Sequence, residues 1–267
     1  STVASDFNGY NISCNGLSDG SINLSVVGGT TSYMYLWNNS STTEDISGIT
    51  AGNYSVNVTD AHGCTKNISI TLSEPNVLSG NSVVISNYNG QNISCNGAND
   101  GAVNLSVTGG TSNYTYSWSN SATTQDVSGL NANAYSVLIT DANGCTTTNT
   151  IALTQPAILN PTIAVNSNYN GQNISCNGMS DGSVDLSVSG GTPNYTYSWS
   201  NSATTQDISG LNANTYSVLI TDVNGCATTT SVTIAEPTIL SSVTSSTDVF
   251  CNGGNNGTTT VTASGGT

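Results

Sequence analysis

The residues best suited to covalent chemistry are cysteines at a fixed spacing. They form three pairs whose members lie 50 residues apart, and each pair begins 81 residues after the previous one. The pairs are Cys14 and Cys64, Cys95 and Cys145, and Cys176 and Cys226. The gap within a pair is constant, whereas the gap to the next cysteine falls from 31 to 25 residues at the end of the chain. We therefore predict one disulfide within each repeat, as in exported proteins.

A seventh cysteine, Cys251, begins a fourth copy of the repeat that stops at Thr267. We expect Cys251 to have no partner within this sequence, with a reactive free thiol as the alternative. A disulfide that closes a loop of 50 residues contributes roughly 4 kcal/mol in the chain-entropy model. A contribution of that size matters to a module of about 80 residues with a small core.

Carboxylates also recur once per repeat, and they support two interpretations. The first is calcium binding by loop oxygens, with Asp60, Asp141 and Asp222 as the candidate ligands. The second is turn formation, because Asp in Asp-Gly and Asp-x-x-Gly bonds its own backbone. The second is favoured, since no Asp-x-Asp-x-Asp cluster is present. Calcium is thus a possible cofactor, and no other cofactor is expected.

Aromatic residues repeat as Tyr-x-Tyr-x-Trp, which places three rings on one face of a strand. The tryptophans are Trp37, Trp118 and Trp199. An exposed stripe could stack on sugars, but the module has few other large side chains for its core. We therefore predict that the tryptophans are structural core residues that pack against the disulfide.

The elements that position these residues read as short strands. In the second repeat Val103, Leu105 and Val107 alternate with polar residues, and Tyr135, Val137 and Ile139 do the same. No helical period is present, and turn signals recur every 8 to 12 residues. The pattern predicts an all-β chain, a tandem array of small immunoglobulin-like β-sandwich repeats with one disulfide each. The expected boundaries are residues 1–75, 76–156 and 157–237, with residues 238–267 starting a truncated fourth repeat.

The composition excludes several classes of function. The chain has 15 acidic residues against one lysine and no arginine, and its net charge is −14. No basic patch is available for nucleic acid, and no apolar run is long enough for membrane insertion. Repeats two and three contain no His, Lys or Arg. We therefore expect a protein that is not an enzyme and has no catalytic residues.

Several motifs together resemble a known repeat. They are Cys-Asn-Gly at residues 14–16 with Asp-Gly at 19–20, Gly-Gly-Thr at 28–30, Tyr-x-Tyr-x-Trp at 33–37 and Thr-Asp-x-x-Gly-Cys at 59–64. In this combination the chain resembles the SprB-type repeat of giant gliding-motility adhesins of Bacteroidota. The resemblance implies a large secreted protein at the bacterial cell surface, associated with the outer membrane and exported by type IX secretion.

Two functions remain open. The repeats are either part of an adhesin that itself attaches to surfaces during gliding, or a passive stalk or filament repeat whose binding site lies elsewhere. The expected partners are the substratum or an extracellular polysaccharide, together with the gliding and type IX secretion machinery. Self-association is a further possibility, because unpaired strand edges can pair.

Overall fold

A computed structural model of the chain describes residues 2–267. The chain forms two compact units, one of residues 1–86 and 99–153 and the other of residues 87–98 and 154–267. The described residues form strands, turns and loops and include no helix. Each unit is considered on its own below.

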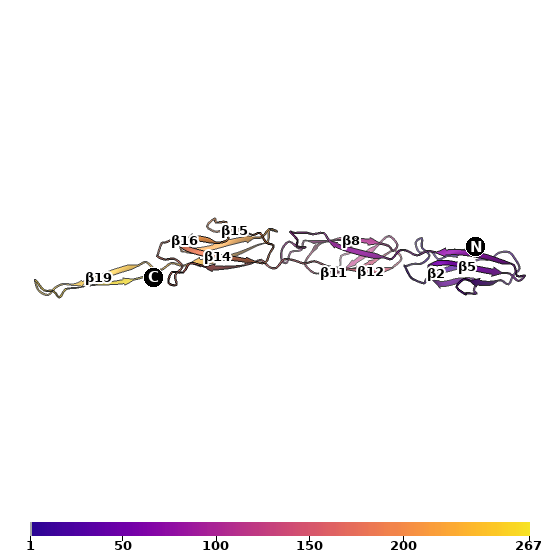
Figure 1. Cartoon of the computed structure of the whole chain (residues 1–267), viewed down its shortest axis with the longest axis horizontal. Coiled ribbons are helices and arrows are strands. Elements are labelled where there is room, and N and C mark those ends of the chain that lie inside the picture. The colour runs from indigo at the N-terminus through magenta and orange to yellow at the C-terminus, as the bar shows by residue number, and fades with distance from the viewer. Residues whose placement is uncertain (1) are drawn as a thin grey trace. The chain divides into compact units, whose positions relative to one another are not determined.

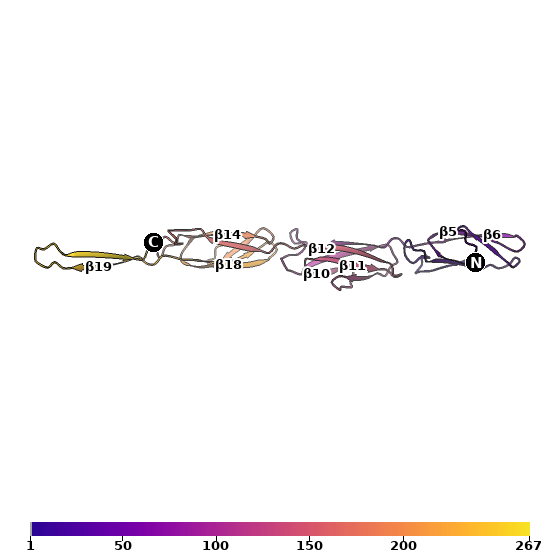
Figure 2. The ribbon, with the colours of Figure 1, turned by 90° about the horizontal axis from the view of Figure 1, so that it is seen from below.

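The first unit contains two sandwiches. The strands of the first are β1 (Thr2–Ala4), β2 (Gly20–Leu24), β3 (Met34–Trp37), β4 (Ile46–Ile49), β5 (Gly52–Thr59) and β6 (Thr65–Leu72). The strands of the second are β7 (Ser79–Val84), β8 (Gly101–Thr108), β9 (Thr115–Trp118), β10 (Val127–Leu130), β11 (Ala134–Thr140) and β12 (Thr146–Ala152). Several of these strands are labelled in Figures 1 and 2.

The second unit contains a third sandwich and a two-stranded ribbon. The sandwich strands are β13 (Asn160–Val165), β14 (Gly182–Ser189), β15 (Thr196–Trp199), β16 (Ile208–Leu211), β17 (Asn214–Thr221) and β18 (Ala227–Ile234). The ribbon pairs β19 (Ser241–Thr247) with β20 (Thr258–Ser264). It is the start of the fourth copy.

Every sandwich is built from two antiparallel three-stranded sheets. In the first, the sheets have the orders β1-β2-β4 and β3-β5-β6. The same order recurs as β7-β8-β10 with β9-β11-β12, and as β13-β14-β16 with β15-β17-β18. This is the strand order of an immunoglobulin sandwich that lacks strand D. The prediction of tandem immunoglobulin-like β-sandwiches is confirmed.

The core of each sandwich follows from the period-two alternation. In β8 the side chains of Val103 and Leu105 are buried, while Asn104 between them is exposed. In β11 the buried residues are Tyr135, Val137 and Ile139. The inner faces of the two sheets meet over these side chains, as in other aligned sandwiches.

Candidate functional site: the junction between repeats

Two disulfides are present among residues 2–267, and both join different repeats. Cys14 is bonded to Cys145, with a Cα–Cα distance of 5.7 Å, and Cys95 is bonded to Cys226, with a distance of 5.6 Å. Each bond spans a sequence separation of 131 residues. The prediction of one bond within each repeat is therefore wrong. The first cysteine of one repeat is bonded to the second cysteine of the next.

The sandwich itself prevents a bond within the repeat. Gly20 at the start of β2 is paired with Ile49, so Cys14 lies at the end of the sandwich where β5 begins at Gly52. Cys64 follows the other end of β5, which is eight residues long. Eight residues of strand cover about 26 Å, whereas a disulfide needs Cα atoms within about 7 Å. The two cysteines of one repeat therefore lie at opposite ends.

Three cysteines of the described chain are free and exposed: Cys64, Cys176 and Cys251. The sequence predicted disulfides for Cys64 and Cys176, so this also corrects that prediction. Under the observed rule, Cys64 is the second cysteine of the first repeat and Cys176 is the first cysteine of the third. Neither has a bonding partner of the complementary kind within residues 2–267.

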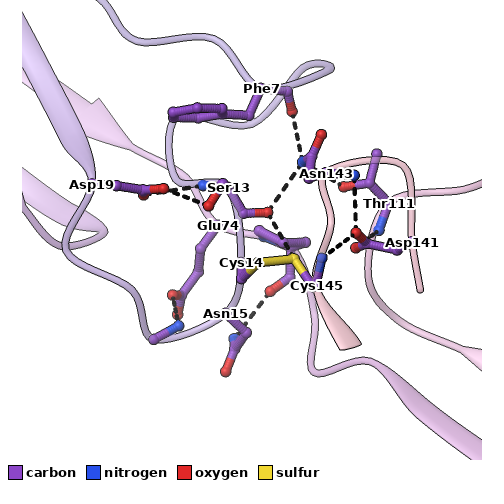
Figure 3. The surroundings of a disulfide bond; sticks show 12 residues. Phe7, Ser13, Cys14, Asn15, Asp19, Glu74, Thr111, Asp141, Asn143 and Cys145 are labelled. Carbon is purple, nitrogen blue, oxygen red and sulfur yellow. Dashed lines mark hydrogen bonds between the residues drawn. A yellow bond between two sulfur atoms is a disulfide. The ribbon is translucent and has the colours of Figure 1, made fainter. Parts of the chain in front are cut away.

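Asn143 is the centre of the hydrogen bonds around the Cys14–Cys145 bond (Figure 3). Its side-chain Nδ2 donates to the carbonyl oxygens of Phe7 and Ser13, at 3.2 and 3.1 Å. It also donates to Thr111 Oγ1 at 3.0 Å, and its Oδ1 accepts from Asn8 Nδ2 at 2.6 Å. One amide of the second repeat thus binds two segments of the first, on both sides of the disulfide.

A second set of bonds shapes the Cys-Asn-Gly loop from within the first repeat. Asn15 Nδ2 donates to the carbonyl oxygen of Pro75 at 3.0 Å, and the Gly16 N–H donates to a Glu74 carboxylate oxygen at 2.7 Å. Asp19 accepts from the N–H and the hydroxyl of Ser13. The loop is thereby fastened to the linker that leads into the next repeat, so loop and linker reach the second sandwich together.

The linker fills the end of the second sandwich. The Gly110 N–H donates to the Asn76 carbonyl oxygen at 2.8 Å, and Leu78 is only 9% exposed. Gly109 has a φ of 71°, and a Cβ there would lie 1.9 Å from the Val77 carbonyl oxygen. Only glycine permits both this conformation and this approach. The Gly-Gly-Thr motif therefore serves as the seat of the linker.

The second unit repeats this junction with equivalent residues. Asn224 Nδ2 donates to the carbonyl oxygens of Tyr88 and Ser94, both at 3.2 Å, and Asn89 donates to Asn224 Oδ1 at 2.6 Å. Asn96 Nδ2 donates to the Pro156 carbonyl oxygen at 3.0 Å. A glutamine, Gln155, takes the place of Glu74 in accepting from the glycine N–H. The arrangement is thus a property of the repeat and occurs with the same partners twice.

The candidate calcium ligands lie beside this junction and hold its turns. Asp141 accepts from the N–H groups of Thr111, Asn143 and Cys145, at 2.8 to 2.9 Å. Asp222 and Asp60 accept the same three bonds in their own repeats. The backbone N–H of Thr30, and then that of Cys64, lowers the pKa of the Asp60 carboxyl from its usual value. All three carboxylates are buried, with exposed fractions of 4 to 9%.

This donor set does not fit calcium, which takes six to eight oxygen ligands. Each carboxylate faces backbone N–H donors, and among residues 2–267 no three His, Cys, Asp or Glu side chains come together around a possible metal position. The hydrogen bonds therefore support the interpretation of these residues as turn formers.

The tryptophans lie away from the junction. Trp37, Trp118 and Trp199 are 2 to 3% exposed, and each indole N–H donates to a backbone carbonyl at 2.9 Å. Trp37 and Trp199 belong to apolar clusters of aliphatic and aromatic side chains. No cysteine belongs to these two clusters as described, so the expected packing of tryptophan on the disulfide is wrong.

Sequence reasoning missed Asn143 and Asn224. Both stand at the variable position of Thr-Asp-x-x-Gly-Cys, where the first repeat has His62. A signal was available, because an asparagine two residues before a junction cysteine recurs at the 81-residue period. It was assigned only to an Asn-Gly turn.

Comparison with known proteins gives one family. The model of the SprB repeat matches residues 10–42, 87–123 and 168–204. No curated protein matches the chain. No helix in the described part of the chain is long and apolar enough to cross a membrane.

Solved structures with some similarity are multidomain extracellular proteins. The N-terminal eight Ig domains of Down Syndrome Cell Adhesion Molecule are 10% identical, with 76% of this chain and 32% of that chain covered and a TM-score of 0.37. This chain thus spans about a third of that one. Drosophila OTK extracellular domains 3–5 are 12% identical, with coverage of 78% and 86% and a TM-score of 0.29. A Ca²⁺-stabilised adhesin that helps an Antarctic bacterium bind ice is 18% identical, with coverage of 91% and 72% and a TM-score of 0.35.

The fold assignment rests on the strand order described above, and the family assignment rests on the three matched segments. Each matched segment contains the first cysteine of a repeat and the Tyr-x-Tyr-x-Trp strand that follows it. The resemblance seen in the motifs is confirmed: the chain is an array that contains three SprB repeats.

Proposed function

We propose that the chain is an extracellular repeat region of a bacterial cell-surface adhesin, associated with the outer membrane, that attaches to surfaces and serves gliding motility. The SprB repeats, the disulfides and the absence of basic patches in the sequence support an exported, surface-located role. Export by a type IX system and contact with the gliding machinery belong to the same proposal. We retain the repeat boundaries after residues 75, 156 and 237 as part of it.

The observation that carries the proposal is the double covalent connection at each junction. The backbone passes from one repeat to the next through Glu74 and Pro75, and the Cys14–Cys145 bond makes a second connection beside it. The hydrogen bonds of Asn143 tie the same two repeats. A load on one repeat is therefore shared by two covalent paths. Such a junction suits a protein that must stay folded under tension at a cell surface.

Attachment would come from weak contacts made many times. The exposed faces of the strands carry Ser, Thr and Asn, as in β12 and β18, whose sequences are TTTNTIA and ATTTSVTI. Hydroxyl and amide groups can bond to a hydrated substratum or an extracellular polysaccharide without charge. A contact that is weak in one repeat gains strength when several repeats engage together.

No catalytic role is proposed. The recurring carboxylates Asp60, Asp141 and Asp222 are occupied by backbone donors. The single histidine is confined to the first repeat, where its Nδ1 lies 2.7 Å from Thr30 Oγ1. An activity shared by the repeats could not depend on it.

A passive stalk is the second candidate. It is favoured by the junction itself, because the linker residue Leu78 fills the end of the second sandwich, where the first repeat has a pocket. A site that is filled in one repeat and open in another is not a ligand site common to the array. In a stalk, the binding function would lie in another domain.

Adhesion of coated beads separates the two candidates. Beads that carry residues 1–237 would be allowed to settle on bare glass and on polysaccharide-coated glass, and then exposed to increasing flow. An unrelated sandwich array of equal length is the control, and a C14S/C145S/C95S/C226S variant removes the junction bonds. We expect retention above the control, with the variant detaching at lower flow. Retention equal to the control on every surface would refute the adhesive role and leave the stalk.

A further inference from the structure

The end of the first sandwich carries the same groups that receive a Cys-Asn-Gly loop in the other two repeats. We call Gly29, Thr30, Asp60, His62 and Cys64, with the pocket beside them, the acceptor face. Asp60 holds the N–H groups of Thr30, His62 and Cys64 at 2.9 to 3.1 Å, as Asp141 holds their counterparts. The Cys64 thiol is free and exposed. The turn that presents the second cysteine is therefore already formed.

A pocket of about 270 Å³ opens beside Cys64, lined in part by Val26, Gly29, Tyr33 and Val58. In the second repeat the corresponding position is occupied by Leu78, whose Cδ1 would lie 2.9 Å from a Cβ placed on Gly110. In the first repeat nothing lies within 4 Å of a Cβ placed on Gly28. The acceptor face is thus open in both places where the other sandwiches are covered, at the thiol and at the leucine seat.

The complementary surface is found in the second unit. Cys176 is free and exposed, and its loop is fastened like that of Cys14. Asn177 Nδ2 donates to the Pro237 carbonyl oxygen at 3.0 Å, and the Gly178 N–H donates to Glu236 at 2.7 Å. Leu240, which follows the linker proline as Leu78 does, is 70% exposed. We call this loop and linker the donor face.

Two differences mark the acceptor face. His62 replaces the junction asparagine, and its Nδ1 pairs with Thr30 Oγ1 as Asn143 pairs with Thr111. The polar contact that orients this side chain is therefore kept, and the other ring nitrogen can donate to a loop carbonyl when it carries the proton. Lys66, the only lysine of the chain, lines the same pocket. It offers one positive charge to a donor face whose loop is held by Glu236.

We propose that the acceptor face docks the donor face of a second copy of this chain, and that the two copies become joined by a disulfide between Cys64 and Cys176. The evidence for this occupant is internal, because the same loop occupies the same face in both junctions of the chain. The reaction requires a small-molecule disulfide as oxidant. One thiolate attacks the oxidant to give a mixed disulfide and one released thiol. The thiolate of the other copy then displaces the second thiol, so that two protons and two electrons leave the cysteines.

The test uses the 267-residue chain with its two junction disulfides intact, incubated with glutathione disulfide. Salt at about 0.5 M screens the repulsion between copies of charge −14. We expect a ladder of oligomers on non-reducing gels that collapses on reduction. Peptide mapping should find Cys64 joined to Cys176. C64S and C176S should each abolish the ladder. An equimolar mixture of the two variants should stop at the dimer, because only one productive pair of thiols remains.

C251S is the matched control. Cys251 begins a Cys-Asn-Gly loop of the same kind, but the only turn contact described for it is the bond from the Gly254 N–H to its carbonyl oxygen. C251S should give the wild-type ladder. A second variant, Leu240→Asp, should slow the coupling several-fold, because a charge would have to enter the apolar pocket.

Three outcomes would overturn the proposal: no cross-linking, comparable yields of Cys64–Cys64 and Cys176–Cys176, or a ladder that depends on Cys251. A monomer that closes its own Cys64–Cys176 bond would overturn it as well. None of these results depends on whether the repeats adhere to surfaces. Failure here is therefore distinguishable from failure of the proposed function.

Discussion

Replacing Cys145 by serine discriminates most directly between a bond across repeats and a bond within a repeat. In the structure its partner is Cys14, whereas equal spacing within repeats had pointed to Cys95. The wild-type chain should take up alkylating reagent at three thiols without reductant, since Cys64, Cys176 and Cys251 are free. In Cys145→Ser a fourth thiol should appear, and peptide mapping should place it at Cys14.

The energetic consequence can be worked from the length of the closed loop. A bond across 131 residues removes about 5 kcal/mol of chain entropy from the unfolded state in the loop-closure model. Thermal unfolding of the double variant C14S/C145S, which introduces no unpaired thiol, should show this loss. For a unit of this size we expect the melting temperature to fall by about 10 to 20 °C if its two sandwiches unfold together.

Cys64→Ser is the matched control, because it removes an exposed thiol without touching a bond, and its melting temperature should equal that of the wild type. Labelling of Cys95 in place of Cys14 in Cys145→Ser would refute the junction and restore a bond within the repeat. One labelled thiol in the wild-type chain would lead to the same conclusion.

Four further predictions concern single features. Trp118→Ala should destabilise its sandwich by about 3 to 5 kcal/mol in denaturant titration, because the indole is 3% exposed; an unchanged midpoint would contradict a core role. Asn143→Ala should cost about 1 to 3 kcal/mol through its lost bonds across the junction, whereas Asn120→Ala, which loses a local turn bond, should cost less. Because backbone N–H groups lower the pKa of Asp60 in the folded state, its contribution to stability is complete above about pH 4 and is lost as the pH falls further; Asp60→Asn should flatten melting temperature against pH in that range. Millimolar calcium should leave the melting temperature unchanged, and a rise would revive the metal interpretation.

The sequence predicted the repeats, the strands and the core well, because each depends on local pattern. Alternation in Val103, Leu105 and Val107 requires a half-buried strand whatever surrounds it, and the structure places the first two in the core. The polar bonds of the junction depend on what one repeat presents to the next. The role of Asn143 could not be derived from its own neighbours, since two of its partners, the carbonyls of Phe7 and Ser13, lie in another sandwich.

Disulfide pairing failed for a topological reason. Any pair of cysteines taken one repeat apart has a constant spacing, so 131 residues recurs as regularly as 50 and spacing alone cannot choose between them. The choice depends on which end of the sandwich each cysteine occupies. Four strands, β2 to β5, separate Cys14 from Cys64, and four reversals would return the chain to its starting end.

The connection between β3 and β4 breaks that count. After the turn in which the Trp37 N–H bonds the Ser41 carbonyl, residues 42–45 run back without forming a strand, and Asp45 bonds the Leu24 N–H at the far end of β2. This passage takes the place of the missing strand D and adds one reversal, so Cys64 emerges at the opposite end from Cys14. Each repeat therefore has a thiol at each end and can form neither bond alone. The loss of one strand from an immunoglobulin sandwich has turned an internal staple into a link between neighbours.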